Sequence, residues 1–182
     1  LIHELSNVAL PSLTTMTSQE MIGDVVILRN RPGTMSESFV SFKAGPNRGH
    51  RHGDQLSVHY CAYGARHAID IMTGYKPEPE QEHLHSRLVV GEWENLDSFE
   101  KVVAFKKSAV ADVAVGELSS DRLRQVPWLP PTGYHLPVPE PTRTVGGLAV
   151  YRRTVILVKS GHARCRDYLV LRDQFWSPKP LR

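Results

Sequence analysis

The chain has 182 residues, 41% of them hydrophobic, which is enough for one globular domain with a core. Its formal net charge is +3, and its lysines and arginines are scattered, which argues against a dedicated nucleic-acid-binding protein. No apolar run approaches the roughly 20 residues of a membrane-spanning helix, and the first segment lacks a signal-peptide pattern. Because residue 1 is leucine, we expect a processed chain or part of a longer protein.

Short apolar segments bounded by turn-forming residues follow one another along the chain. The alternation is clearest in QLSVHYCAYG, where Leu56, Val58 and Tyr60 share one face of a predicted strand. About nine such segments predict an all-β fold, an antiparallel β-sandwich or barrel. We place these strands at residues 24–30, 38–45, 55–64, 67–71, 86–93, 100–108, 111–118, 147–160 and 167–176.

Three segments interrupt the strand pattern. Residues 75–85 are rich in proline and glutamate and are predicted to form a surface loop. Residues 126–147 contain six prolines, which excludes a helix interior or a central strand and predicts a long loop. Residues 119–126 are compatible with one short helical turn. We therefore expect residues 1–182 to form a single β-sandwich domain or a fragment of one.

Histidines gather in one region, since six of the nine lie between positions 50 and 85. In an extended strand, His50, His52 and Asp54 of the sequence HRHGD would point to the same side. Asp70 follows a turn, where an antiparallel strand would bring it back toward His52, and His85 begins a later segment. Two imidazoles and one carboxylate (His52, Asp70 and His85) form a common zinc ligand set with a fourth position open, and manganese or iron would also accept it.

The histidine pattern also has a simpler explanation, because two histidines one residue apart occur by chance on protein surfaces. His83 is an alternative ligand to His85, and His59 and His67 are interpreted as ordinary half-exposed histidines. Spacing alone therefore leaves open whether these residues bind a metal.

The segment GPNRGHRHGDQLSVHYCAYGARHAIDIMTGY resembles the C-terminal β-sandwich domain of heparinase II/III-like polysaccharide lyases. That family has an H-x-H-x-D motif, then an apolar strand that ends in glycine, then an aspartate followed by glycine and tyrosine. A later strand of the family opens with His-Asn, whereas this chain has Ser86 after His85. The segments VYRRTVILVKS and DYLVLRDQF are similar to the family's paired strands, so the resemblance spans residues 22–176.

The resemblance implies an antiparallel β-sandwich of the super-sandwich type, the C-terminal portion of an enzyme that also has an α/α-toroid. Such enzymes cleave uronic-acid polysaccharides, including glycosaminoglycans, by β-elimination at C5 of the uronate. By position, His50 would be a catalytic histidine and Tyr75 would reach the cleft. His52, Asp70 and His85 would hold Zn²⁺ or Mn²⁺.

The resemblance also implies supporting residues and partners. Asp54 would orient the HxH segment from behind the metal ligands. Arg48 and Arg51 flank the motif and would contact the uronate, because an arginine fork pairs with a carboxylate; a solvated surface position is the alternative for both. The implied partners are an acidic polysaccharide and a helical toroid in the same or a companion chain. Neither nucleic acid nor membrane is implied, and the family suggests a periplasmic or secreted protein.

Three other hypotheses stay open at this point. A cupin-like metal-binding barrel also carries H-x-H on a strand, although no acidic residue follows here at the spacing of cupins. A uronate epimerase would use the same site as the lyase. A non-catalytic carbohydrate-binding sandwich would instead stack sugars on aromatic residues such as Trp93, Trp128 and Trp176.

Overall fold

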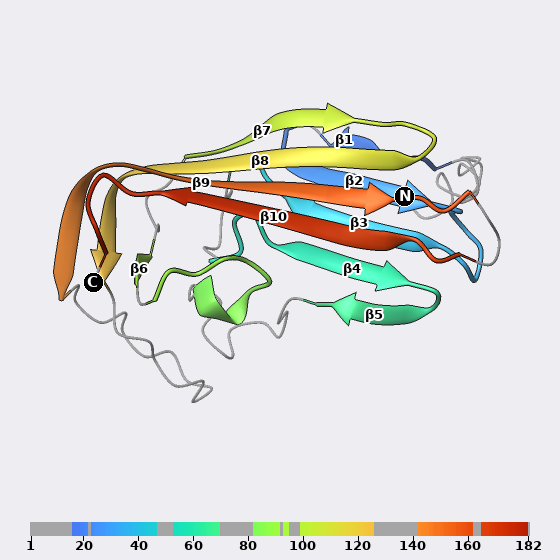
Figure 1. The fold of residues 1–182 in the computed structure, drawn as a ribbon, viewed down its shortest axis with the longest axis horizontal. Coiled ribbons are helices and arrows are strands. Elements are labelled where there is room, and N and C mark those ends of the chain that lie inside the picture. Colours follow the sequence, from blue (N-terminus) through green and yellow to red (C-terminus); the bar gives the residue numbers. More distant parts are fainter. Residues whose placement is uncertain are drawn as a thin grey trace, which may run out of the picture.

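The computed structural model describes residues 16–21, 23–46, 53–69, 82–91, 93–94, 99–125, 142–161 and 165–181. Within these residues the chain forms two antiparallel β-sheets that pack face to face, with one 3₁₀ turn at Glu82–Leu84 and no α-helix (Figure 1). The prediction of an all-β, antiparallel β-sandwich is therefore confirmed. No described segment is a helix long and apolar enough to cross a bilayer.

The first sheet contains five strands, and each strand pairs antiparallel with its neighbour in sequence. The four later strands fall within or beside segments that the alternation predicts, whereas the first, short and exposed, was not predicted. In sheet order the strands are β1 (Gln19–Met21), β2 (Val25–Asn30), β3 (Ser38–Lys43), β4 (Val58–Ala62) and β5 (Ala65–Ala68).

The second sheet is built on one long central hairpin. Its strands are β6 (Trp93–Glu94), β7 (Phe99–Lys106), β8 (Ala111–Gln125), β9 (Arg143–Val158) and β10 (Tyr168–Trp176). Strand β9 lies between β8 and β10, while β6 and β7 both pair with β8 at different positions. Among the described strands, neighbours in space are thus mostly neighbours in sequence, unlike the two Greek keys of a jelly roll, the architecture of cupins.

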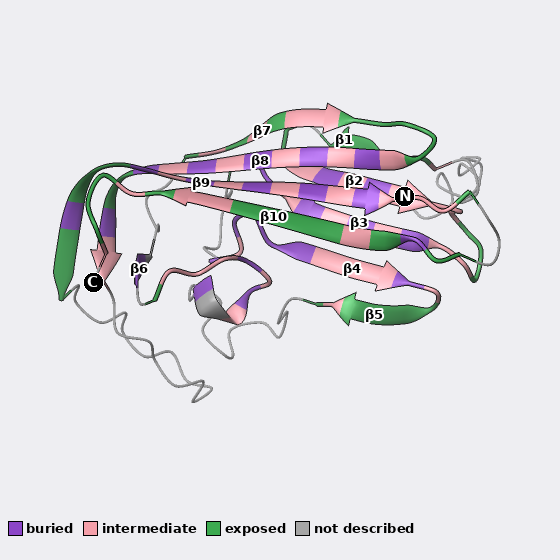
Figure 2. Ribbon diagram, viewed as in Figure 1, coloured by how far each residue is buried: buried purple, intermediate pink, exposed green. Residues whose placement is uncertain are grey.

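The hydrophobic core lies between the two sheets. Along β8 and β9 buried residues alternate with less buried ones, because successive side chains of a strand point to opposite faces (Figure 2). The first sheet contributes Val26, Leu28, Val40, Phe42 and Val58, and the second contributes Ala114, Leu118, Tyr151, Val155 and Leu157. Each fully buried large aliphatic or aromatic side chain contributes about 1.5–3 kcal/mol, so this layer is the main source of stability.

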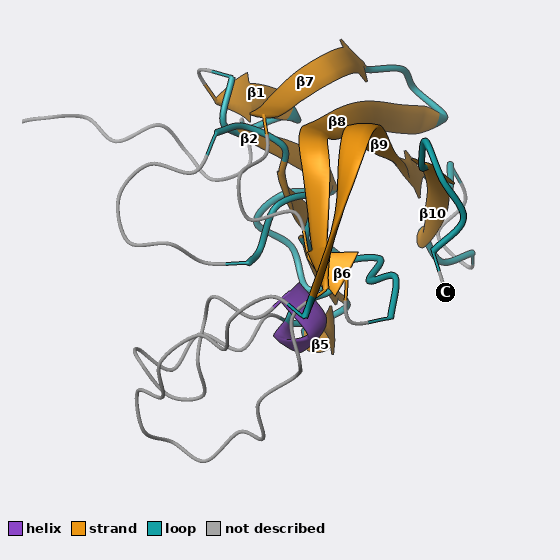
Figure 3. Cartoon of the chain, turned by 90° about the vertical axis from the view of Figure 1, so that its left-hand side faces the viewer, coloured by secondary structure: helices purple, strands orange, loops and turns teal. Residues whose placement is uncertain are grey.

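Two predictions fail at the far end of the central hairpin. Residues 119–125, predicted as a helical turn, continue strand β8, and residues 143–147, predicted as loop, begin β9. The two segments pair with each other, from Ser119 opposite Val150 to Gln125 opposite Arg143, and this long-range pairing outweighs the local polar sequence. Figure 3 shows this bent end of β8 and β9 beside β6.

The predicted strand at residues 86–93 is also wrong. Residues 86–87 form bends, Val90 makes an isolated bridge with Trp93, and among the described residues of this segment only Trp93 lies in a strand, as the first residue of β6. The reason is that polar groups here bond to the second sheet and to nearby loops: Leu88 N donates to the hydroxyl of Tyr151 at 3.1 Å. Residues 86–90 therefore pack on the side of the sandwich outside both sheets, and the chain joins the second sheet only at Trp93.

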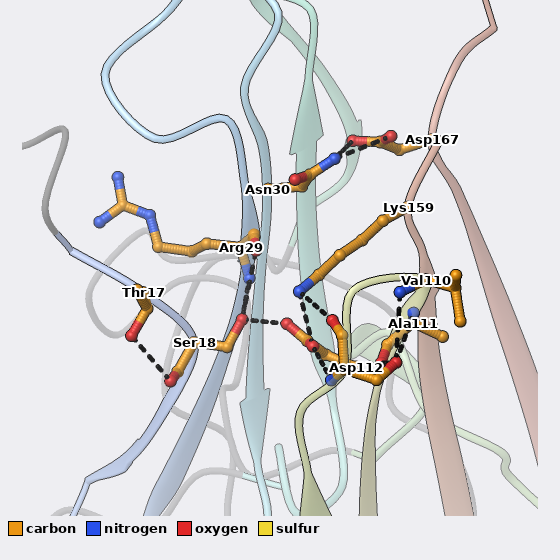
Figure 4. Close-up of polar contacts among 10 residues, drawn as sticks. Thr17, Ser18, Arg29, Asn30, Val110, Ala111, Asp112, Lys159 and Asp167 are labelled. Atoms are coloured by element: carbon orange, nitrogen blue, oxygen red, sulfur yellow. Dashed lines mark hydrogen bonds and ion pairs between the residues drawn. The ribbon is translucent and has the colours of Figure 1, made fainter. Parts of the chain in front are cut away.

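Two buried carboxylates join the sheets at one end of the sandwich (Figure 4). Asp112, at the start of β8, accepts a hydrogen bond from Ser18 Oγ and pairs with Lys159 Nζ at 2.6 Å. Asp167, just before β10, accepts hydrogen bonds of 3.0 and 3.1 Å from Asn30 Nδ2 at the end of β2. Each carboxylate thus ties the first sheet to the second.

Candidate functional site

The structure describes two of the residues predicted to act at the site, His85 and Asp54. The other predicted residues lie outside the described part of the chain: Arg48, His50, Arg51, His52, Asp70 and Tyr75. Among the described residues, no group of three or more His, Cys, Asp or Glu side chains is close enough to hold a metal ion. The predicted ligand set as a whole thus falls outside what the structure tests.

His85 is a buried histidine that follows the 3₁₀ turn. Its side chain lies in the interior, with the residue only 7% exposed. Its backbone N–H donates to Glu82 O at 3.2 Å, and its carbonyl accepts from Arg87 N at 2.8 Å. These two bonds fold the chain tightly around His85, which fixes the direction in which its imidazole leaves the backbone.

The residues after His85 bond to two segments of the histidine region. Ser86 Oγ donates to the carbonyl of Ile69 at 3.1 Å. Arg87 Nη1 donates to the carbonyl of Gly53 at 3.2 Å and to Gln55 Oε1 at 3.0 Å. The described residues that adjoin His52 and Asp70 in the sequence are therefore both attached to the His85 segment.

Asp54 lies in a turn that leads from the histidine motif to β4. Its carboxylate pairs with Lys43 Nζ at 2.7 Å, and its carbonyl accepts from Ser57 N at 3.0 Å. Leu56, inside this turn, has a φ of 60° and is fully buried. Asp54 thus anchors the turn to the end of β3.

Beside His85, two arginines lie inside the protein. Arg153, on β9, is 4% exposed and donates from Nε and Nη2 to Asp173 at 2.7 and 2.9 Å. Its Nη1 donates to the carbonyls of Leu56 at 2.9 Å and Ser86 at 2.5 Å. One guanidinium therefore joins β9, β10, the turn before β4 and the His85 segment.

Arg87 is the second buried arginine, at 9% exposure. Its Nη2 lies 3.3 Å from a carboxylate oxygen of the buried Glu82. Among the described atoms, its Nε and Nη2 make no hydrogen bond. Burial of such a charge is costly without an opposite charge, so the position of Arg87 depends on Glu82 and on the acceptors at residues 53 and 55.

Tyr151 lies close to both arginines. The guanidinium carbons of Arg87 and Arg153 are 5.7 and 5.8 Å from its ring centroid, within the range of cation–π attraction. Its hydroxyl donates to Asp173 Oδ1 at 2.9 Å and accepts from Leu88 N. Burial raises the pKa of this hydroxyl well above its ordinary value, so Tyr151 stays protonated and serves as a hydrogen-bond donor.

We call Glu82, Arg87, Tyr151, Arg153 and Asp173 the buried arginine network. Burial alone would raise the pKa of Asp173, but the hydrogen bonds and charge of Arg153 outweigh it and hold that pKa below its ordinary value. Two cations thus face two carboxylates, and all three guanidinium nitrogens of Arg153 donate to protein acceptors. The network is suited to holding the His85 segment and residues 53–56 in a fixed relation, as functional sites require of their supporting residues.

Sequence reasoning did not identify this network, although one signal was present. In YRRTVILV, alternation places Tyr151, Arg153 and Val155 on the same face, which turns out to be the core face. An arginine between two inward residues of a strand indicates a buried ion pair, because an unpaired charge there would be too costly. Its partner, Asp173, lies directly opposite on β10.

No protein-family model, curated protein or solved structure matches this chain. The resemblance to heparinase II/III-like lyases consequently stays a prediction from the sequence.

Proposed function

We propose that this chain is the β-sandwich portion of a uronic-acid polysaccharide lyase, with a metal site formed by His52, Asp70 and His85. In this proposal His50 faces the substrate and takes part in β-elimination. Part of the active site, including a tyrosine, comes from a helical toroid in the same or a companion chain.

The observation that carries this proposal is the attachment of the His85 segment to both neighbouring segments. Ser86 bonds to Ile69, which precedes Asp70, and Arg87 bonds to Gly53, which follows His52. Three segments far apart in sequence, each with one proposed ligand, are therefore connected at adjacent residues. A chance pair of histidines would not require this connection.

The donor set fits zinc. Two imidazoles and one carboxylate are typical ligands of a zinc site that keeps a fourth position open. A bound ion would supply a positive charge that organises the site and stabilises developing negative charge on a uronate. The buried arginine network would act behind it, because ligands hold a metal well only when neighbouring groups fix their orientation.

The chemistry of β-elimination fits histidine and arginine residues at such a site. The proton at C5 of a uronate becomes acidic only when the adjacent carboxylate is neutralised or strongly hydrogen-bonded. His50 is suited to remove that proton or to bind the carboxylate, because an imidazole pKa lies near neutrality. Arg48 and Arg51 would pair with uronate carboxylates nearby. Alone, this chain is proposed to bind metal and acidic polysaccharide with little turnover.

Metal binding tests the proposal directly. Protein stripped with a chelator is titrated with zinc while its melting temperature and its bound metal are measured. At a free zinc concentration of 100 times Kd, binding stabilises the folded state by about 2.7 kcal/mol. For a chain of this size that corresponds to a rise of about 5–10 °C.

Two variants and a control make the test specific. His85→Ala and Asp70→Asn should each abolish the zinc-dependent rise, while their zinc-free melting temperatures show whether the variants still fold. His59→Ala, a partly buried histidine on β4, should keep the full rise. The proposal is contradicted if the wild-type protein binds no zinc. It is also contradicted if His59→Ala and His85→Ala lose the zinc-dependent rise in melting temperature equally.

A further inference from the structure

A polar cleft of about 240 Å³ lies at the turn between β4 and β5, between the edge hairpin of the first sheet and the start of β10. Three aromatic rings line it, those of Tyr60, Tyr63 and His67, together with the charged residues Arg166 and Asp167. Two alanines form the rest of its wall. None of these residues belongs to the buried arginine network or to the proposed metal ligands.

Tyr63 has a backbone conformation that tyrosine rarely adopts. Its φ is 53° and that of Gly64 is 74°, as in the two-residue hairpin turns that usually carry asparagine and glycine. A bulky residue in this region costs free energy and persists only where its surroundings fix it. Here the hydroxyl of Tyr63 accepts from Asp167 N at 2.6 Å and from Arg31 Nη2 at 2.9 Å.

Two guanidiniums lie close to the Tyr63 ring. The carbons of Arg31 and Arg166 lie 5.5 and 5.4 Å from its centroid. Arg31, which also has a positive φ of 53°, pairs with Asp167 at 2.7 Å. The turn thus presents an aromatic ring with two cations within the range of cation–π attraction.

The charges of the cleft do not cancel. The side chain of Asp167 is fully buried, and its carboxylate is engaged by Arg31, by Asn30 and by Ser160 N at 2.8 Å. Arg166, by contrast, is exposed at the rim. Because Arg31 neutralises Asp167, the charge of Arg166 remains to attract an anion.

We propose that this cleft binds one anionic sugar residue, a hexuronate, whose carboxylate pairs with Arg166. An arginine fork matches a planar carboxylate with two parallel hydrogen bonds. The aromatic rings offer apolar contact to the C–H groups of a pyranose, and Tyr60 and His67 lie with centroids 5.3 Å apart. The volume is below the roughly 300–1,000 Å³ of sites for drug-sized ligands, which limits the cleft to a single ring.

The choice of a uronate among carboxylate ligands rests on the proposed function. The cleft would hold the acidic polysaccharide at a second point on the sandwich, apart from the reacting residue. Its residues come entirely from the described part of the chain and need no metal. Binding there is therefore measurable with a chelator present, which separates this inference from the proposed metal site.

The test uses tetramannuronate as the acidic probe and mannotetraose as its uncharged counterpart. Titration calorimetry in chelator-containing buffer is expected to show tetramannuronate binding with a Kd of about 1 mM or tighter, and no mannotetraose binding in the same range. Arg166→Ala should weaken tetramannuronate binding about tenfold, because a charge-assisted bidentate pair is lost. Arg172→Ala, which removes an exposed arginine of β10 outside the cleft, should change it less than about twofold.

The outcomes separate the possibilities. Absence of tetramannuronate binding to the wild-type chain, or unchanged binding in Arg166→Ala, overturns the inference. An equal loss of tetramannuronate affinity in Arg166→Ala and Arg172→Ala would show nonspecific attraction to a basic surface and would overturn the inference as well. Mannotetraose binding as tight as that of tetramannuronate would also overturn it. A chain that binds no zinc but binds tetramannuronate through Arg166 would refute the proposed metal site and support this cleft.

Discussion

Replacing Arg153 by methionine tests whether the buried arginine network holds the structure together. The substitution keeps a long unbranched side chain but removes four hydrogen bonds, two to Asp173 and one each to the carbonyls of Leu56 and Ser86. The side chain of Arg153 is 4% exposed and that of Asp173 is 24% exposed. The carboxylate would thus be left partly buried without its cation.

The expected cost follows from these contacts. Removal of one partner of a buried ion pair typically destabilises a protein by about 3–5 kcal/mol. Asp173 keeps some contact with water and the Tyr151 hydroxyl as a donor, so we expect a value near the lower end, about 3 kcal/mol. A double variant, Arg153→Met with Asp173→Leu, should be less destabilised than Arg153→Met alone, because no uncompensated charge remains.

The neighbouring arginine provides a matched control. Arg152 also lies directly opposite an acidic residue, Glu117, but it points to the outer face with a side chain 40% exposed. Arg152→Met should therefore cost less than about 1 kcal/mol. Urea unfolding, followed by circular dichroism, gives both free energies from the transition midpoints. If Arg153→Met costs no more than Arg152→Met, the inward pair does not hold the structure as argued.

Two further perturbations test the electrostatics and the packing. The pKa values of Asp167 and Asp173 lie below the ordinary value, since hydrogen bonds from arginine and other donors outweigh the opposing effect of burial. The unfolded chain therefore binds more protons below about pH 5, and the free energy of unfolding should fall as pH decreases toward about 2. Melting temperatures should fall in the same way, and their dependence on pH should be shallower in Asp173→Asn. An identical pH dependence in this variant would argue against the Arg153–Asp173 ion pair. Gly116→Ala would place its Cβ 2.5 Å from Leu56 Cδ2 and 2.7 Å from Phe42 Cζ, so it should lower the free energy of unfolding in urea by about 1–3 kcal/mol. Gly146→Ala, with open space around its Cβ, should lower it little. Equal stability of the two glycine variants would show that the core at Gly116 accommodates an added methyl group.

Alternation in the sequence was sufficient to predict most strands. Phe42, Val58 and Leu118 alternate with outward residues, and the structure buries all three between the sheets. Turn-forming residues marked most strand ends, as at Gly64 between β4 and β5. These signals are local, so they fix which residues form strands but not which strands become neighbours.

The failed predictions share one cause, which is contact between distant segments. The segment after His85 has the composition of a strand, yet the hydroxyl of Tyr151 and the guanidinium of Arg153 take up its backbone groups. Residues 119–125 look polar and helical, yet β9 offers them a partner. No local pattern carries this information.

The candidate site was predictable only in part. The sequence drew attention to His85, and the structure shows it buried, two residues before Arg87, which bonds to Gly53. The buried arginine network and the cleft at Tyr63 were not found, because the members of each come from segments that are distant in the sequence. Among the residues of the network and the cleft, strand periodicity could predict only the inward position of Arg153.

The proposed metal site is tested most directly by a crystal structure of the chain grown with zinc, with data collected at the zinc absorption edge. We expect one anomalous peak with His52, Asp70 and His85 as ligands, at distances of about 2.0–2.2 Å. An absence of any peak at these residues, or a zinc ion bound by other side chains, would contradict it.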